Sequence, residues 1–145
     1  MNKHIVRTAG IVALATLGLA TVPAQAHHAF AAEFDASRPV KVTGTVTKLR
    51  LVNPHSWIFI DVKNPNGSVT NWGFEFGTPS GLENAGLTKA DFAPGKVITL
   101  SGFQAKSGGA FGHSTLATLP DGRSLKTGSA PDEPGAKKPA GPKAS

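Results

Sequence analysis

Short runs of alternating apolar and polar side chains occupy the middle of the chain, a pattern typical of half-buried β-strands. Between residues 40 and 46 the apolar side chains stand at even positions, whereas Leu49 and Leu51 stand at odd positions. A slip of one position inside a continuous strand indicates a β-bulge, which bends the strand. The sequence therefore predicts one long, bent first strand over 40–51, which ends before Asn53 and Pro54.

Further strands are predicted after it, separated by turns rich in glycine, proline and asparagine. They cover residues 57–62, 69–76, 97–103 and 114–119, with a last short segment near Leu125. A short helix over 78–87 and a helical turn over 89–92 separate the third strand from the fourth. Three strands, a helix and two strands is the order of an OB-fold, a five-stranded Greek-key barrel. We therefore predict an all-β fold with one short helix, a small OB-like barrel; an irregular sandwich is the alternative.

The first 26 residues have the three parts of a secretory signal peptide. Lys3 and Arg7 are basic, residues 9–20 form an apolar run, and Ala24 and Ala26 are small side chains before a cleavage site. The run has 12 residues, fewer than the roughly 20 that a membrane-spanning helix needs, and no cysteine follows it for a lipid anchor. We predict cleavage after Ala26, or alternatively after Ala24, no membrane span in the mature protein, and a periplasmic or secreted location.

The composition changes again at the other end of the chain. Residues 128–145 are rich in proline, glycine and lysine and carry no large apolar side chain, so we predict a disordered tail. The predicted organisation is a signal peptide (1–26), an N-terminal segment with two histidines (27–39), the barrel domain (40–127) and the tail (128–145). Without the signal peptide the chain keeps 13 Lys+Arg and 9 Asp+Glu, and the basic residues are scattered. We therefore expect no binding of nucleic acid.

The histidines suggest a metal site. Cleavage after Ala26 would leave His27 with a free α-amine, which can chelate a metal ion together with its imidazole Nδ1. His55 and His113 fall in the predicted loops between strands one and two and between strands four and five, which border the usual OB-fold binding face. Nitrogen donors favour Cu(II), and the chain has no cysteine and a single methionine, Met1. We predict that His27 supplies amine and imidazole, His55 a third nitrogen, and His28 or His113 a fourth.

Other interpretations of the same residues stay open. Each histidine is also compatible with an ordinary structural role, and Asp61 and Glu75 are interpreted as solvated carboxylates on neighbouring strands. A metal-free alternative is an OB-like module that binds a protein, glycan or small ligand on the face of strands two and three. Four aromatic side chains gather there: Trp57, Phe59, Trp72 and Phe74. No catalytic constellation of residues is recognisable, so we predict that the chain is not an enzyme.

Several motifs are similar to those of domain-of-unknown-function family 6152, a family of small exported bacterial proteins. They are HHAFAAEFD (27–35), GTVTK (44–48), VNPHSWI (52–58), NWGFE (71–75) and LPDGR (119–123). The resemblance runs from His27 to about Thr127, and Ala29 stands where family members typically have serine. It implies export and a shared fold, and it names no activity.

Overall fold

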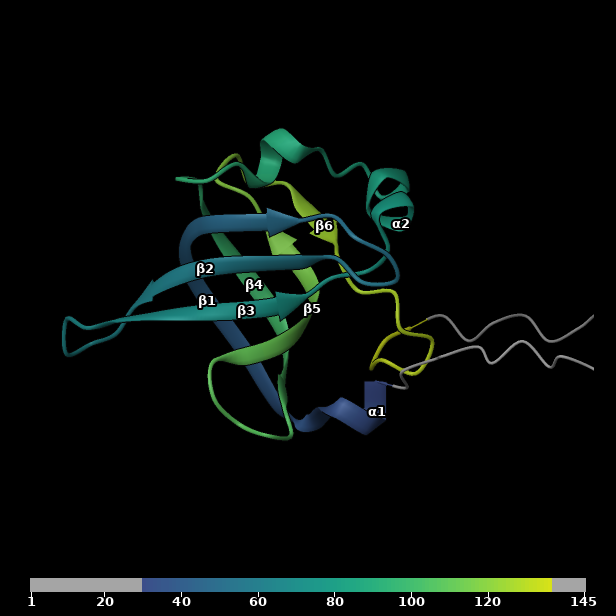
Figure 1. Cartoon of the computed structure of the whole chain (residues 1–145), viewed down its shortest axis with the longest axis horizontal. Helices are drawn as coiled ribbons and strands as arrows, with labels where there is room; N and C mark the ends of the chain where they lie inside the picture. Colours follow the sequence, from purple (N-terminus) through teal and green to yellow (C-terminus); the bar gives the residue numbers. More distant parts are fainter. Residues whose placement is uncertain (1–29, 137–145) are drawn as a thin grey trace, which may run out of the picture.

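The computed structural model describes residues 30–136 (Figure 1). Six strands run through this part of the chain: β1 (Phe34–Arg50), β2 (Trp57–Lys63), β3 (Val69–Glu75), β4 (Val97–Ala105), β5 (Phe111–Thr118) and β6 (Ser124–Lys126). Three short helical segments accompany them: α1 (Phe30–Glu33), α2 (Pro79–Asn84) and the 3-10 helix η1 (Lys89–Phe92). The all-β class predicted from the alternating pattern is confirmed.

Five of the strands close into a barrel. The order along the sheet is β3-β2-β1-β4-β5-β6, and an additional pairing between β3 and β5 completes the ring of hydrogen bonds. The β3–β5 pairing is parallel and the others are antiparallel. β6 lies outside the ring, paired with β5. The predicted five-stranded barrel with a helix between its third and fourth strands is therefore confirmed. β6 contains the last short segment predicted near Leu125, and α1 is added beside the barrel.

The first strand is long and bent, as its slipped alternation predicts. Its register against β2 shifts between Val46 and Lys48, where the apolar parity changes. β4 pairs with β1 over its first part and β2 pairs over its second part. β1 begins at Phe34 rather than at the predicted Val40. Of the added residues, Phe34 and Pro39 pair with β4, and the register shifts between them.

Apolar side chains from every strand fill the barrel, and α2 and η1 add theirs from the segment between β3 and β4. Thr78 caps the N-terminus of α2 by accepting a hydrogen bond from Gly81 N–H. The buried cluster consists of Val46, Ile58, Ile60, Phe74, Phe76, Leu82, Leu87, Phe92, Ile98, Leu100, Ala117, Leu119 and Leu125. Full burial of one such side chain contributes roughly 1.5–3 kcal/mol, so this cluster is the main source of the barrel's stability.

A second apolar cluster joins α1 to the barrel and consists of Phe30, Phe34, Ala105 and Ala130. Ala130 belongs to the segment predicted as a disordered tail, yet residues 128–136 run back alongside α1 (Figure 1). The packed part of the chain thus extends beyond the predicted domain end at residue 127, because this polar segment finds its partners far away in the sequence. Within residues 30–136, no helix has the length and apolar character needed to span a membrane. The predicted signal peptide lies outside the described residues.

Candidate functional site

Glu75 is the centre of a buried polar cluster. It is the last residue of β3, only 7% of its surface is exposed, and it stands beside His113 in the parallel pairing of β3 with β5. The prediction of a solvated carboxylate is therefore wrong for Glu75, because β5 covers the end of β3 that a simple hairpin would leave open. Asp61, on β2, is half-buried and accepts a hydrogen bond from Asn71 at 2.7 Å.

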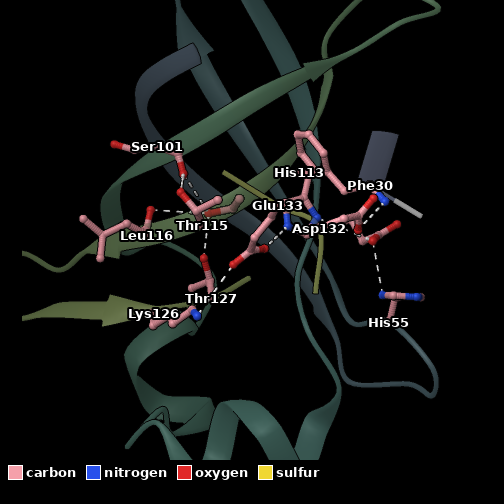
Figure 2. Close-up of polar contacts among 12 residues, drawn as sticks. Phe30, His55, Ser101, His113, Thr115, Leu116, Lys126, Thr127, Asp132 and Glu133 are labelled. Atoms are coloured by element: carbon pink, nitrogen blue, oxygen red, sulfur yellow. Dashed lines mark hydrogen bonds and ion pairs between the residues drawn. The ribbon is translucent and has the colours of Figure 1, made fainter. Parts of the chain in front are cut away.

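His113 stands within β5, and not in the loop before it as predicted, and it is 1% exposed. Its ring lies edge-on to that of Phe30 in α1, with the ring centroids 5.5 Å apart. His113 Nδ1 lies 3.6 Å from Glu75 Oε1, and Nε2 lies 2.7 Å from Glu133 Oε2 (Figure 2). Gly102 on β4 permits this close packing, because a Cβ there would lie 1.9 Å from the His113 carbonyl oxygen.

The two carboxylates decide the charge of this histidine. Burial alone would lower the pKa of His113, but the hydrogen bond to Glu133 and the attraction of Glu75 outweigh it, so the pKa is raised. In the metal-free protein His113 is thus disposed to carry a proton between two acidic side chains.

His55 reaches the same carboxylate from the loop between β1 and β2, where the sequence predicts it. Its Nδ1 lies 3.1 Å from Glu75 Oε1, and its side chain is 23% exposed. The peptide bond between Asn53 and Pro54 is cis. Two backbone hydrogen bonds tie the loop to the end of β3, Ser56 N to the Gly77 oxygen at 3.0 Å and Phe76 N to the Ser56 oxygen at 2.8 Å. The loop and the strand end are therefore held together, which brings His55 to Glu75.

The Nδ1 atoms of His55 and His113 are buried and have no hydrogen-bond partner. Both lie within ion-pair distance of Glu75 Oε1, but without the alignment of a regular hydrogen bond. Such unpaired buried atoms are rare, because each costs about 1–3 kcal/mol. Adjacent ligands of a four-coordinate metal ion, at about 2.0–2.1 Å from it, lie about 2.8–3.4 Å apart. The separation of His55 Nδ1 from Glu75 Oε1, 3.1 Å, falls in this range, whereas that of His113 Nδ1, 3.6 Å, is slightly longer.

The cluster is not a complete metal site by itself. Within residues 30–136, no three or more His, Cys, Asp or Glu side chains are arranged to hold a metal ion. The other two predicted ligands, His27 and His28, lie outside the described residues. Of the four predicted histidines, the structure thus brings His55 and His113 together beside the carboxylate of Glu75.

Glu133, from the segment predicted as a tail, is 4% exposed and bonds to His113. Its second oxygen, Oε1, lies 3.7 Å from Lys126 Nζ. Gly128 leaves room for this carboxylate, since a Cβ there would lie 2.2 Å from Glu133 Oε2. The sequence analysis missed Glu133, because a polar, proline-rich segment carries no local sign of a partner on β5.

Its neighbour Asp132 holds the beginning of α1. The carboxylate accepts a hydrogen bond from Phe30 N–H at 2.9 Å (Figure 2) and another from Ala31 N–H at 3.1 Å. Burial raises the pKa of Asp132, but these two bonds outweigh it, and the pKa is lowered. Asp132 is therefore a charged cap on the first described residues of the chain.

The aromatic side chains of β2 and β3 were predicted as an alternative binding surface, but several of them pack against other rings of the protein. Phe74 is fully buried and stacks on Trp72 at a centroid distance of 5.6 Å. Trp57 stacks on Phe111 at 5.3 Å. Phe59 borders a hollow of about 410 Å³, which is also lined by Thr47, Lys48 and Asn71.

The model of a family of unknown function (DUF6152) matches residues 14–114 of the chain. The chain belongs to this family. The match covers the four candidate histidines and Glu75, and it ends before the segment that contains Asp132 and Glu133. Membership in DUF6152 confirms the resemblance noted in the sequence and assigns no activity. The comparisons with curated proteins and with solved structures found no match.

Proposed function

We propose that this member of DUF6152 is an exported protein that binds Cu(II). The donors are the α-amine and imidazole of His27 and the Nδ1 atoms of His55 and His113, with His28 as a further nitrogen donor and Glu75 beside them. One observation carries the proposal: two buried imidazole nitrogens without hydrogen-bond partners lie near the same carboxylate oxygen. The role is binding or transfer of the ion, without catalysis.

The charges around His113 support a cation. Glu75 and Glu133 are both buried, and buried carboxylates are stable only when positive charge compensates them. A proton on His113 supplies that charge in the metal-free protein. A metal ion at Nδ1 would supply it instead, while Nε2–H stays bonded to Glu133, an arrangement common among histidine ligands of metal ions.

The chain is long enough for His27 to join the cluster. Phe30, whose ring packs on His113, follows His27 by three residues. An extended chain covers at most about 3.6 Å per residue, so the Cα atom of His27 lies within about 11 Å of that of Phe30. The separation of the N-terminus from the barrel is thus no obstacle to the proposed ligand set.

The donor types favour copper over other ions. Imidazole and amine nitrogens suit Zn(II), Ni(II) and Cu(II), and Cu(II) has the highest intrinsic affinity of this series. The chain contains no cysteine, and its single methionine, Met1, belongs to the predicted signal peptide. A site without sulfur ligands selects the oxidised ion, Cu(II), rather than Cu(I).

The test uses protein that has been exported with its own leader, and whose first residue is determined by mass spectrometry. We expect His27 as the first residue, one Cu(II) per chain, and an electron paramagnetic resonance spectrum with nitrogen hyperfine splitting. A variant with one added residue before His27 keeps the barrel intact but converts the free amine into an amide. It should lose the spectrum of the chelate.

Two substitutions then test the barrel ligands. His55→Ala should weaken Cu(II) binding, whereas Asp61→Asn, a matched change of a strand carboxylate outside the cluster, should leave the binding unchanged. Two results would refute the proposed ligand set. One is a different first residue in the exported protein, and the other is a Cu(II) affinity equal to that of the wild type in both the extended protein and His55→Ala.

The metal-free binding module is distinguished by a separate readout. A glycan, peptide or small ligand on the face of β2 and β3 would change the fluorescence of Trp57 or Trp72, and a metal chelator would not affect the change. The Cu(II) proposal expects the opposite, a signal that a chelator abolishes.

A further inference from the structure

Residues 127–136, here called the C-terminal strap, follow β6 and run to the beginning of α1, where Asp132 binds Phe30. Thr127 is fully buried, and its carbonyl oxygen accepts a hydrogen bond from Gly77 N–H at 2.7 Å. Gly77 also leaves room for the strap, since a Cβ there would lie 2.8 Å from Ser129 Oγ. Ala130 then joins the apolar cluster around Phe30. The strap is therefore packed along its course and is not a loose extension of β6.

The strap ends on the two parts of the proposed metal site. Asp132 binds the backbone N–H groups of Phe30 and Ala31, which are 102 and 101 residues away in the sequence. Glu133 binds His113 Nε2. Adjacent residues thus hold the segment that follows His27 and His28 on one side, and a buried histidine of the barrel on the other.

The bond to Glu133 determines which nitrogen of His113 is free. A carboxylate accepts hydrogen bonds and cannot donate them when ionised, so Nε2 carries the hydrogen in the neutral ring. Nδ1, which lies 3.6 Å from Glu75 and has no hydrogen-bond partner, is then the nitrogen with a free lone pair. The tautomer that this bond selects is the one that presents a metal donor toward His55 and Glu75.

We propose that the C-terminal strap positions the metal site: Glu133 fixes the tautomer and orientation of His113, and Asp132 fixes the N-terminal segment against the barrel. Both are positioning residues and neither is a ligand. This inference rests on the Cu(II) function proposed above and adds to it the parts of the chain that hold the ligands in place. Carboxylates bonded to ligand histidines typically change metal affinity by about 10–100-fold when they are removed.

A purely structural strap would not need these charges. The strap is already fastened by the backbone bond of Thr127 and by Ala130. Placing a buried carboxylate at Glu133 is costly unless it is paired, and an apolar side chain would pack there without that cost. The shortest contact of the Glu133 carboxylate is with His113 at 2.7 Å, and Lys126 lies farther away at 3.7 Å, so the charge acts mainly on His113.

The first arm of the test measures the tautomer of His113 in metal-free, full-length protein by nitrogen-15 NMR, after the ring has been titrated to its neutral form. We expect the Nε2–H tautomer in the wild type and in Asp132→Ala, and a mixture of both tautomers in Glu133→Ala. Glu133→Asp, which keeps a carboxylate acceptor, should restore most of the Nε2–H form and serves as the second variant if Glu133→Ala fails to fold. The same tautomer in Glu133→Ala as in the wild type overturns the proposal.

The second arm measures Cu(II) affinity of the same proteins. We expect Glu133→Ala to bind about 10–100-fold more weakly and Asp132→Ala to lose the contribution of the N-terminal amine, with a changed paramagnetic resonance spectrum. Asp121→Ala removes an exposed carboxylate that accepts hydrogen bonds from Arg123, outside the cluster, and it should match the wild type. Wild-type affinity in both strap variants overturns the strap proposal and leaves the Cu(II) function standing. A wild type that binds no Cu(II) overturns both, whatever the tautomer arm shows.

Discussion

Two buried carboxylates in this protein have very different surroundings. Asp91, in η1, accepts hydrogen bonds from the backbone N–H of Thr88 at 2.9 Å and from its hydroxyl at 2.7 Å, and its other oxygen pairs with Arg123. Glu75 has two histidine nitrogens near one oxygen, and neither nitrogen makes a hydrogen bond. Asp91 is saturated with partners, whereas the Glu75 cluster keeps unused donors and acceptors inside the protein.

The difference distinguishes a fully hydrogen-bonded carboxylate from the cluster proposed to bind a ligand. At Asp91 the bonds from Thr88 and Arg123 stabilise the ionised form, and they lower the pKa of Asp91 to about 2 despite burial. At Glu75 the two histidine nitrogens contact the carboxylate at 3.1 and 3.6 Å without regular hydrogen bonds. Under the proposed function, substitutions at the two sites should therefore separate stability from binding.

The largest effect is expected from removing the buried cation. His113→Leu removes the nearest basic partner of Glu133, which keeps Lys126 Nζ at 3.7 Å, and it leaves Glu75 with His55. We expect a loss of about 3–5 kcal/mol in the free energy of unfolding of the metal-free protein. His55→Leu, at a partly exposed position, should cost about 1 kcal/mol or less. Urea unfolding measures both. Equal costs for the two variants would show that burial of the charges does not govern this cluster.

Bound metal should stabilise the fold through the Glu75 cluster and not through the hydrogen-bonded site of Asp91, Thr88 and Arg123, here called the saturated site. At a free Cu(II) concentration about 100 times the Kd, the wild type should gain about 2.7 kcal/mol, since the folded state alone assembles the ligands. His55→Ala should gain much less at the same Cu(II) concentration. The measurement compares urea midpoints with Cu(II) and with a chelator, and Asp61→Asn is the control. The same gain in His55→Ala as in the wild type would place the ion elsewhere.

The barrel was predictable because its determinants are local. The parity slip between Val46 and Leu49 predicts the bulge that the register against β2 contains, and the turn at Asn64–Gly67 predicts the β2–β3 hairpin. The helical turn at 89–92 also follows from nearby residues, since Thr88 and Asp91 cap each other. Alternation, turns and caps act over a few residues, so the sequence displays them directly.

The candidate site was only half predictable because its contacts are distant in sequence. His55 lies in the predicted loop, but the burial of Glu75 depends on the parallel pairing of β3 with β5, which no local pattern encodes. The strap has the composition of a disordered tail, and its order depends on partners such as Phe30, 102 residues away. Composition indicates how much apolar surface a segment can bury by itself. It does not indicate that the carboxylates of Asp132 and Glu133 bind Phe30 and His113 elsewhere in the fold.

The saturated site should respond to substitution without any change in metal binding. Asp91→Ala removes the capping box of η1, and we expect a loss of about 1–2 kcal/mol in the free energy of unfolding. Asp121→Ala, at an exposed partner of the same Arg123, should change the stability little. Urea unfolding and Cu(II) titration are run on both variants. A weaker Cu(II) affinity in Asp91→Ala would contradict the prediction, because it would mean that Asp91 affects metal binding at the Glu75 cluster.

The smallest expected effect is the acid dependence of the saturated site. The folded pKa of Asp91, about 2, lies below its ordinary value of 3.8, so the ionised form stabilises the fold. This contribution is fully present above about pH 4 and is lost as the pH falls through about 2. Because Arg123 is half exposed, solvent screening reduces it to about 1 kcal/mol. The stability difference between wild type and Asp91→Asn, measured by urea unfolding at several pH values, should therefore shrink on acidification from pH 5 toward 2. A constant difference over that range would mean that the carboxylate holds Thr88 by hydrogen-bond geometry alone and that its charge contributes nothing.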